Sequence, residues 1–95
     1  MSIDDSMAQP HGTSAAYCDY ILRQQLAALQ PRHIVDFGAG AGKNGSIARE
    51  VLGPAVRLTA VEGYEESARH LSASGIYDEV CHSLIQDWVA AIAPA

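Results

Sequence analysis

The chain has 95 residues, which is enough for one small domain and too few for two. Its hydrophobic content of 48% and charged content of 18% are typical of a globular protein, which excludes wholesale disorder. The net charge of −5 makes broad binding of nucleic acid or anionic membranes unlikely on electrostatic grounds. The sequence shows no apolar run that could span a membrane and no signal peptide, so we expect a cytoplasmic protein.

The cysteines and histidines predict neither a disulfide nor a metal site. Cys18 and Cys81 form no CxxC pair and are expected to be free, buried thiols. Three of the four histidines have no metal-ligand spacing with each other or with the cysteines: His11, His33 and His70. We therefore expect no bound metal.

The first part of the chain predicts an arm followed by a helix. Residues 1–12 are polar and acidic, which indicates a flexible N-terminal arm. Thr13 or Ser14 is expected to cap a helix that ends before Pro31. Apolar residues recur through this segment at helical spacing: Cys18, Ile21, Leu22, Leu26 and Leu29. Two aromatic rings of its first half are expected to pack against a sheet: Tyr17 and Tyr20.

The rest of the chain predicts three strand–helix units. Strands are expected over residues 33–37, 56–62 and 76–82. Helices are expected after the first strand, with an apolar face from Ile47 to Leu52, and over residues 65–73 and 84–93. Strands that alternate with helices form parallel sheets with right-handed crossovers. The sequence therefore predicts an α/β, Rossmann-like domain whose three-stranded parallel sheet has the order 3-2-1.

The glycine-rich segment after the first strand is the main candidate for a ligand site, and two readings of it compete. A phosphate-binding GxxxxGK[ST] loop is excluded, because Phe37 and Asn44 occupy the required glycine and hydroxyl positions. A dinucleotide-binding GxGxxG pattern fits Gly40, Gly42 and Gly45, and Glu62 lies 20 residues beyond Gly42. This register predicts the alternative function, a fragment of an NAD- or FAD-dependent oxidoreductase.

The second reading uses Gly38, Gly40 and Gly42, with Asp36 ahead of them. Here the segment IVDFGAGAG resembles motif I of the class I S-adenosylmethionine-dependent methyltransferases. LTAVEGYEESA is similar to their motif II, a strand that ends in an acidic residue. YCDYILRQQLAALQPRHIVDFG and YDEVCHSLIQDW resemble the segment before motif I and the third strand with its adenine-flanking loop. The resemblance extends from about Tyr17 to Trp88.

The resemblance implies S-adenosylmethionine or S-adenosylhomocysteine as the ligand. In such a site Asp36 would serve the methionyl end, and Glu62 would accept the ribose hydroxyls. The backbone of the glycine turn would approach the ligand closely, and the loops after the second and third strands would border the adenine. The implied site residues are Asp36, Phe37, Gly38, Ala39, Gly40, Glu62, Gly63, Leu84 and Ile85. At Leu84 the chain departs from the family, whose members often carry an acidic residue there.

The family's sheet is larger, and this chain supplies only the three strands of its first half. We therefore expect residues 13–95 to form a partial methyltransferase domain that binds the cofactor and is incomplete as an enzyme, with no catalytic residue assigned. The first strand would then lie at an open, apolar edge of the sheet. From this open edge we expect the chain to associate with itself or to pair with a separate second half of the domain. A non-catalytic interaction module that retains the fold is a further alternative.

Overall fold

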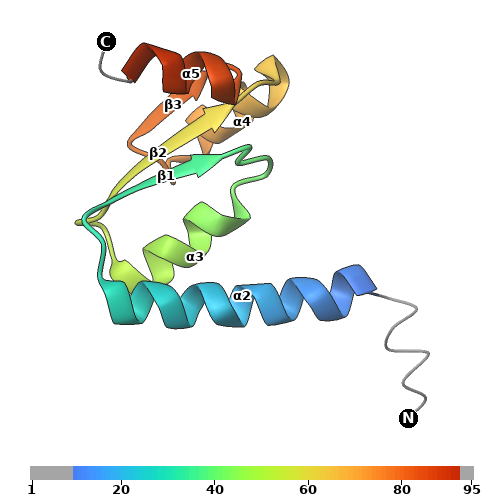
Figure 1. Cartoon of the computed structure of the whole chain (residues 1–95), viewed down its shortest axis with the longest axis vertical. Coiled ribbons are helices and arrows are strands. Elements are labelled where there is room, and N and C mark those ends of the chain that lie inside the picture. Colours follow the sequence, from blue (N-terminus) through green and yellow to red (C-terminus); the bar gives the residue numbers. More distant parts are fainter. Residues whose placement is uncertain (1–9, 93–95) are drawn as a thin grey trace.

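A computed structural model describes residues 10–92 (Figure 1). Its elements are α2 (Pro10–Leu29), β1 (His33–Phe37), α3 (Lys43–Leu52), β2 (Arg57–Glu62), α4 (Glu65–Ser74), β3 (Glu79–His82) and α5 (Ile85–Ile92). Most of the predicted arm, residues 1–9, lies outside the described residues. The helix begins at Pro10, earlier than the predicted cap, since proline fits the first turn of a helix, where its missing N–H has no partner to lose.

The three strands form one parallel sheet in which β2 lies between β1 and β3. β1 and β2 are in register from the pair His33–Arg57 to the pair Phe37–Val61. Because all three strands run the same way, their carboxyl ends lie at one edge of the sheet. The predicted α/β class and strand order are thus confirmed, and the arrangement is compatible with half of a Rossmann-like fold.

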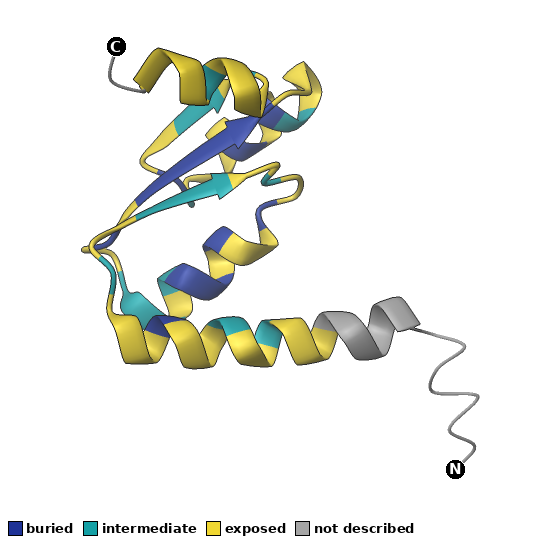
Figure 2. Ribbon diagram, viewed as in Figure 1, coloured by how far each residue is buried: buried dark blue, intermediate teal, exposed yellow. Residues whose placement is uncertain are grey.

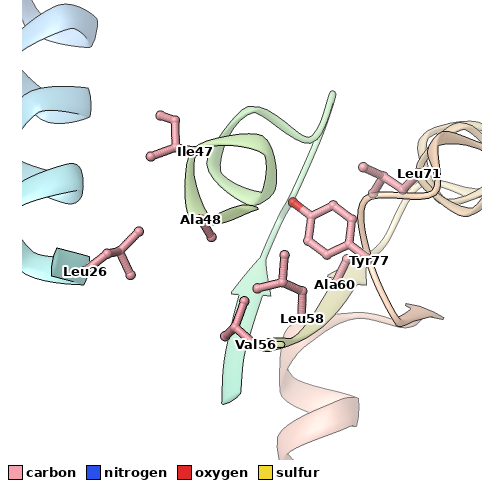
Figure 3. Close-up of a cluster of buried hydrophobic side chains, with 8 residues drawn as sticks. All are labelled: Leu26, Ile47, Ala48, Val56, Leu58, Ala60, Leu71 and Tyr77. Atoms are coloured by element: carbon pink, nitrogen blue, oxygen red, sulfur yellow. The ribbon is translucent and has the colours of Figure 1, made fainter. Parts of the chain in front are cut away.

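The hydrophobic core fills one face of this sheet. There β2 places Leu58 and Ala60 against helices α2, α3 and α4 (Figure 3). The buried members of the cluster are Leu26, Ile47, Ala48, Val56, Leu58, Ala60, Leu71 and Tyr77. Figure 2 shows that β2 is buried along nearly all of its length, whereas β1 is half-buried. The central strand therefore anchors the domain.

The opposite face of the sheet is covered by α5. Phe37 points to this face, and its ring meets that of Trp88 edge to face at a centroid distance of 5.5 Å. Trp88 is half-buried, but four large aliphatic residues at or next to this helix are exposed: Leu84, Ile85, Val89 and Ile92. The sequence predicted an apolar face for this helix, and in the structure most side chains of that face are exposed to solvent.

Three predictions about packing are wrong. Tyr17 and Tyr20 are 65% and 56% exposed rather than packed on the sheet. The reason is the placement of α2, which packs along α3 and buries only Leu26 of its described side chains (Figure 1). The prediction that Cys18 is buried is wrong for the same reason, since this helix leaves it exposed; Cys81 is half-buried, and both cysteines are free thiols.

The third strand is also shorter than predicted, because the residues before it have other partners. Tyr77 turns into the core. The Asp78 carboxylate accepts the N–H of Leu58 at 2.8 Å, and the N–H of Asp78 donates to the carbonyl of Leu58 at the same distance. Strand β3 therefore begins only at Glu79.

Candidate ligand-binding site

The glycine turn leaves β1 at the carboxyl edge of the sheet. Gly38, Gly40 and Gly42 have φ values of 64°, 56° and 90°, a left-handed conformation that residues with a Cβ rarely adopt. A Cβ built on Gly38 would meet no atom within 4 Å, so this part of the turn faces open space. The alternating glycines are thus required by the backbone, and they leave main-chain atoms accessible to a ligand.

Gly45 is required for a different reason. It lies inside α3, and a Cβ there would come within 2.4 Å of the ring of Tyr77. The N–H of Gly45 donates to the Tyr77 hydroxyl at 3.2 Å, and this hydroxyl donates to Asp36 Oδ2 at 2.6 Å. Burial, followed by the hydrogen bond to Asp36, raises the pKa of Tyr77 above its ordinary value, so the hydroxyl remains a donor. The Tyr77 hydroxyl therefore links Asp36 at the end of β1 to Gly45 in α3.

Glu62 ties the turn to the end of β2. Its Oε1 accepts the N–H of Gly40 at 2.9 Å, and its Oε2 accepts the N–H of Tyr64 at 3.1 Å. These bonds, that from Gly40 first, lower the pKa of Glu62 although the residue is only 5% exposed. The side chain is therefore an ionised carboxylate at neutral pH. Each oxygen retains a further lone pair that a ligand hydroxyl could use.

The loop after β3 completes this edge of the sheet. The N–H of Ser83 donates to the Glu62 carbonyl at 3.0 Å, and His82 Nε2 donates to the Gly63 carbonyl at 3.1 Å. A Cβ on Gly63 would lie 3.2 Å from Leu84 Cδ2. The predicted residues Gly63 and Leu84 are thus neighbours beside Glu62.

Not all of the predicted site residues point toward the carboxyl edge of the sheet. Gly38, Ala39, Gly40, Glu62, Gly63 and Leu84 lie around the carboxyl edge, and Ile85 begins α5 beside them as an exposed side chain. The Asp36 carboxylate points beneath the turn toward Tyr77. The Phe37 ring points to the opposite face, against Trp88. Asp36 thus supports the turn in this structure, and contact with a ligand stays a prediction.

A cavity of about 640 Å³ lies beside the turn, between it and the start of α4. Its lining contains one predicted residue, Gly40. Tyr64, which the sequence placed in the loop expected to border the adenine, also lines it. The sequence did not indicate the remaining lining residues: Ala41, Glu65, Glu66, Ser67 and His70. It also missed Tyr77, although a glycine within a helical pattern, Gly45, was a signal of close packing against that helix.

The charge around the turn is mainly acidic. Asp36 and Glu62 flank it, and Glu65 and Glu66 begin α4. Lys43, the single lysine of the sequence, pairs with Asp19 at 3.0 Å. Among the residues that the structure describes, no three His, Cys, Asp or Glu side chains come together in a group that could hold a metal ion.

Fold and site together define an α/β domain with a glycine turn and an ionised carboxylate at the carboxyl edge of a parallel sheet. No protein-family model matches the chain, and no match is found among curated proteins. Within residues 10–92, no helix is both long enough and apolar enough to cross a membrane.

Proposed function

We propose that this domain binds S-adenosylmethionine and S-adenosylhomocysteine at the carboxyl edge of its sheet, as the cofactor-binding part of a methyltransferase. The observation that carries the proposal is the hydrogen bond from Gly40 to Glu62. It places an ionised carboxylate against an open turn of alternating glycines. A nucleoside ribose offers two hydroxyl donors, which suit the remaining lone pairs of such a carboxylate.

The electrostatics favour a ligand that carries positive charge and lacks phosphate. A pyrophosphate would sit near Asp36, Glu62 and Glu66 and would be repelled by them, whereas Glu65 is paired with Arg69. The sulfonium and amino groups of S-adenosylmethionine would instead be attracted. Since Lys43 is already paired with Asp19, the turn offers no ready cation for a phosphate.

The dinucleotide alternative rests on one specific observation. Gly42 caps α3, and Gly45 allows Tyr77 to pack closely against the same helix, as the second and third glycines of a GxGxxG motif would. However, this register makes no use of Gly38, which has a positive φ of 64° at the start of the turn. The register Gly38–Gly40–Gly42 therefore accounts for more of the turn.

Calorimetric titration of the chain with S-adenosylhomocysteine, S-adenosylmethionine and NAD tests the proposal. We expect binding of the first two and, in Glu62→Gln, a dissociation constant raised about 10- to 100-fold, since a hydrogen bond to a charged group contributes roughly 1.5–3 kcal/mol. The matched control is Glu50→Gln, which removes an exposed carboxylate of α3 that pairs with Arg23 and lies outside the lining of the cavity, and which should leave the affinity unchanged. Binding of NAD alone would contradict the proposal, and binding of neither ligand would favour an interaction module.

In the proposed methyl transfer, the main contribution of this site would be to orient the bound cofactor. A bound S-adenosylmethionine would present its sulfonium methyl group for in-line attack by a nucleophile, and holding the two in line is the main source of acceleration. We assign no catalytic residue and no acceptor. The free thiols Cys18 and Cys81 fit a reducing compartment, which supports the cytoplasm as the proposed location.

A further inference from the structure

The outer edge of β1 presents a row of main-chain groups to which the sheet supplies no partner. The Arg32 carbonyl accepts from Arg57, and the Gly38 N–H donates to Val61, so these even-numbered residues face β2. Along a strand, main-chain groups alternate between its two sides. His33, Val35 and Phe37 therefore direct their N–H and C=O groups away from β2. Such an edge is a template for another strand.

We propose that a second copy of this chain pairs with this edge, β1 against β1, in antiparallel orientation. A two-fold axis through Val35 would place Val35 opposite Val35 of the second copy, and His33 opposite Phe37. In this register each of the three outward-facing residues both donates and accepts one hydrogen bond. The two sheets become one continuous sheet, closed by a self-complementary interface. This inference is independent of the proposed ligand.

Charge complementarity supports the same register. Arg32 and Asp36 lie on the same face of β1, and the pairing makes Arg32 of one copy a diagonal neighbour of Asp36 in the other, within reach of a long side chain at roughly 7–8 Å. The two Asp36 residues also become diagonal neighbours across the axis, so the two contacts between Arg32 and Asp36 offset the repulsion between these carboxylates. Arg32 is exposed and, among the described side chains, makes no ion pair. Asp36 uses Oδ2 for Tyr77, which leaves Oδ1 for a guanidinium. The two-fold axis makes this contact twice.

An apolar cavity at the same edge is also covered by this pairing. Its volume is about 180 Å³, and its lining includes Leu22 and Leu26 of α2 together with Ile34, Val35 and Asp36 of β1. A cavity of roughly 150 Å³ with an aliphatic lining accommodates benzene, so this one is large enough for an aliphatic side chain. Ile34 of the second copy, opposite Asp36, would lie over it.

The other free edge of the sheet is less suited to pairing. Strand β3 is shorter than β1, and its first residue, Glu79, is exposed. A charged side chain on a short edge strand discourages association. The edge of β1 is therefore the better site for pairing with a second copy.

Sedimentation velocity of the ligand-free chain from micromolar to millimolar concentration tests this inference, with two proline variants as a matched pair. Val35→Pro removes an outward N–H from the centre of the β1 edge and leaves the bonds between β1 and β2 in place. We expect its dimer dissociation constant to rise on the order of tenfold or more, because one hydrogen bond is lost on each side of the axis. Glu79→Pro makes the same change at the β3 edge and should dimerise as the wild type does.

Arg32→Glu provides an independent test that leaves every strand hydrogen bond unchanged. It replaces an attraction to Asp36 by a repulsion, so we expect weaker dimers, and added salt should weaken the wild-type dimer while strengthening that of the variant. A wild-type chain that stays monomeric at millimolar concentration overturns the proposal and leaves the edge to a strand from another protein. A dimer that survives both Val35→Pro and Arg32→Glu, or that Glu79→Pro dissociates, overturns it as well.

Discussion

At the scale of single residues, Tyr77 connects the strand that feeds the turn to the helix that follows it. Its hydroxyl accepts from Gly45 and donates to Asp36, and the residue is only 9% exposed. Neither partner lies near it in sequence. A single buried hydroxyl thus holds the two sides of the glycine turn at a fixed separation.

We predict that Tyr77→Phe lowers the free energy of unfolding by about 1–3 kcal/mol, because it leaves the Gly45 N–H buried without a partner. Urea unfolding followed by circular dichroism measures this change. Tyr20→Phe is the control: its ring is 56% exposed, and removing its hydroxyl should alter stability by less than about 0.5 kcal/mol. Equal effects in the two variants would show that the contact with Asp36 and Gly45 contributes nothing specific.

Glu62 gives the domain a pH dependence of known sign. Its pKa in the folded state lies below the ordinary value of 4.5, mainly through the hydrogen bond from Gly40. The stabilisation is therefore complete above the pKa of the unfolded state and is lost as the pH falls from about 4.5 through the folded-state pKa. Glu62→Gln, whose amide nitrogen cannot accept the N–H of Tyr64, lacks this dependence.

We predict that wild type is more stable than Glu62→Gln at neutral pH and that this difference shrinks as the pH falls below about 4.5. Urea midpoints measured across this range, with Glu66→Gln as a second reference, provide the test. A difference that stays constant with pH would mean that folding does not change the pKa of Glu62.

At the scale of whole elements, Arg49 fastens the end of α3 to the loops that precede β2 and β3. Its Nε donates to the Ile76 carbonyl at 2.9 Å, and its Nη1 donates to the Val56 carbonyl at 2.6 Å. Its Nη2 pairs with Asp78 at 3.0 Å. A planar guanidinium can reach these separate acceptors at once, whereas a lysine ammonium cannot.

We predict that Arg49→Lys lowers the free energy of unfolding by about 1.5–3 kcal/mol, the contribution of hydrogen bonds to a charged group. The matched control is Arg23→Lys, since Arg23 forms an exposed ion pair with Glu50, and such a pair contributes roughly 0–1 kcal/mol. Chemical denaturation of both variants measures these changes in the free energy of unfolding. If Arg49→Lys were no more harmful than Arg23→Lys, the carbonyl contacts would be dispensable.

The sequence predicted well those elements whose signals are local. Strand β1 was predicted with its bounds, because an apolar run passes directly into alternating glycines. Glu62 was singled out because a carboxylate follows the second strand, and the structure places it at the turn. The bond that joins it to Gly40 was not foreseen, since periodicity carries no information on which N–H group a buried carboxylate meets.

Contacts between distant residues could not be predicted in this way. Asp36 and Tyr77 are 41 positions apart, and nothing in either segment indicates that they meet. For the same reason the sequence assigned Asp36 to a ligand and left Tyr77 in a strand. The apolar stripe of α5 was recognised from its spacing, but spacing does not reveal that Val89 and Ile92 are exposed among the described residues.

At the scale of the whole molecule, the two faces of the sheet are unequally covered. Helices α2, α3 and α4 enclose a core on one face, where Leu58 and Leu71 are fully buried. On the other face α5 has no fully buried residue, and its Trp88 rests on Phe37. The free energy of local unfolding is lower where fewer apolar contacts are buried. The domain should therefore open first at α5 and last at β2.

We predict that, in native-state hydrogen exchange, the amides of α5 exchange fastest among the hydrogen-bonded amides of α3, α4, α5 and the sheet, and those of β2 slowest. Trp88→Ala should accelerate exchange in α5 much more than in β2, because it removes the aromatic contact that holds this helix to the sheet. The control is His70→Ala on the exposed surface of α4, which should leave the pattern unchanged. Equal acceleration in α5 and β2 would show that the domain opens as a single unit, since both faces of the sheet would then be lost together.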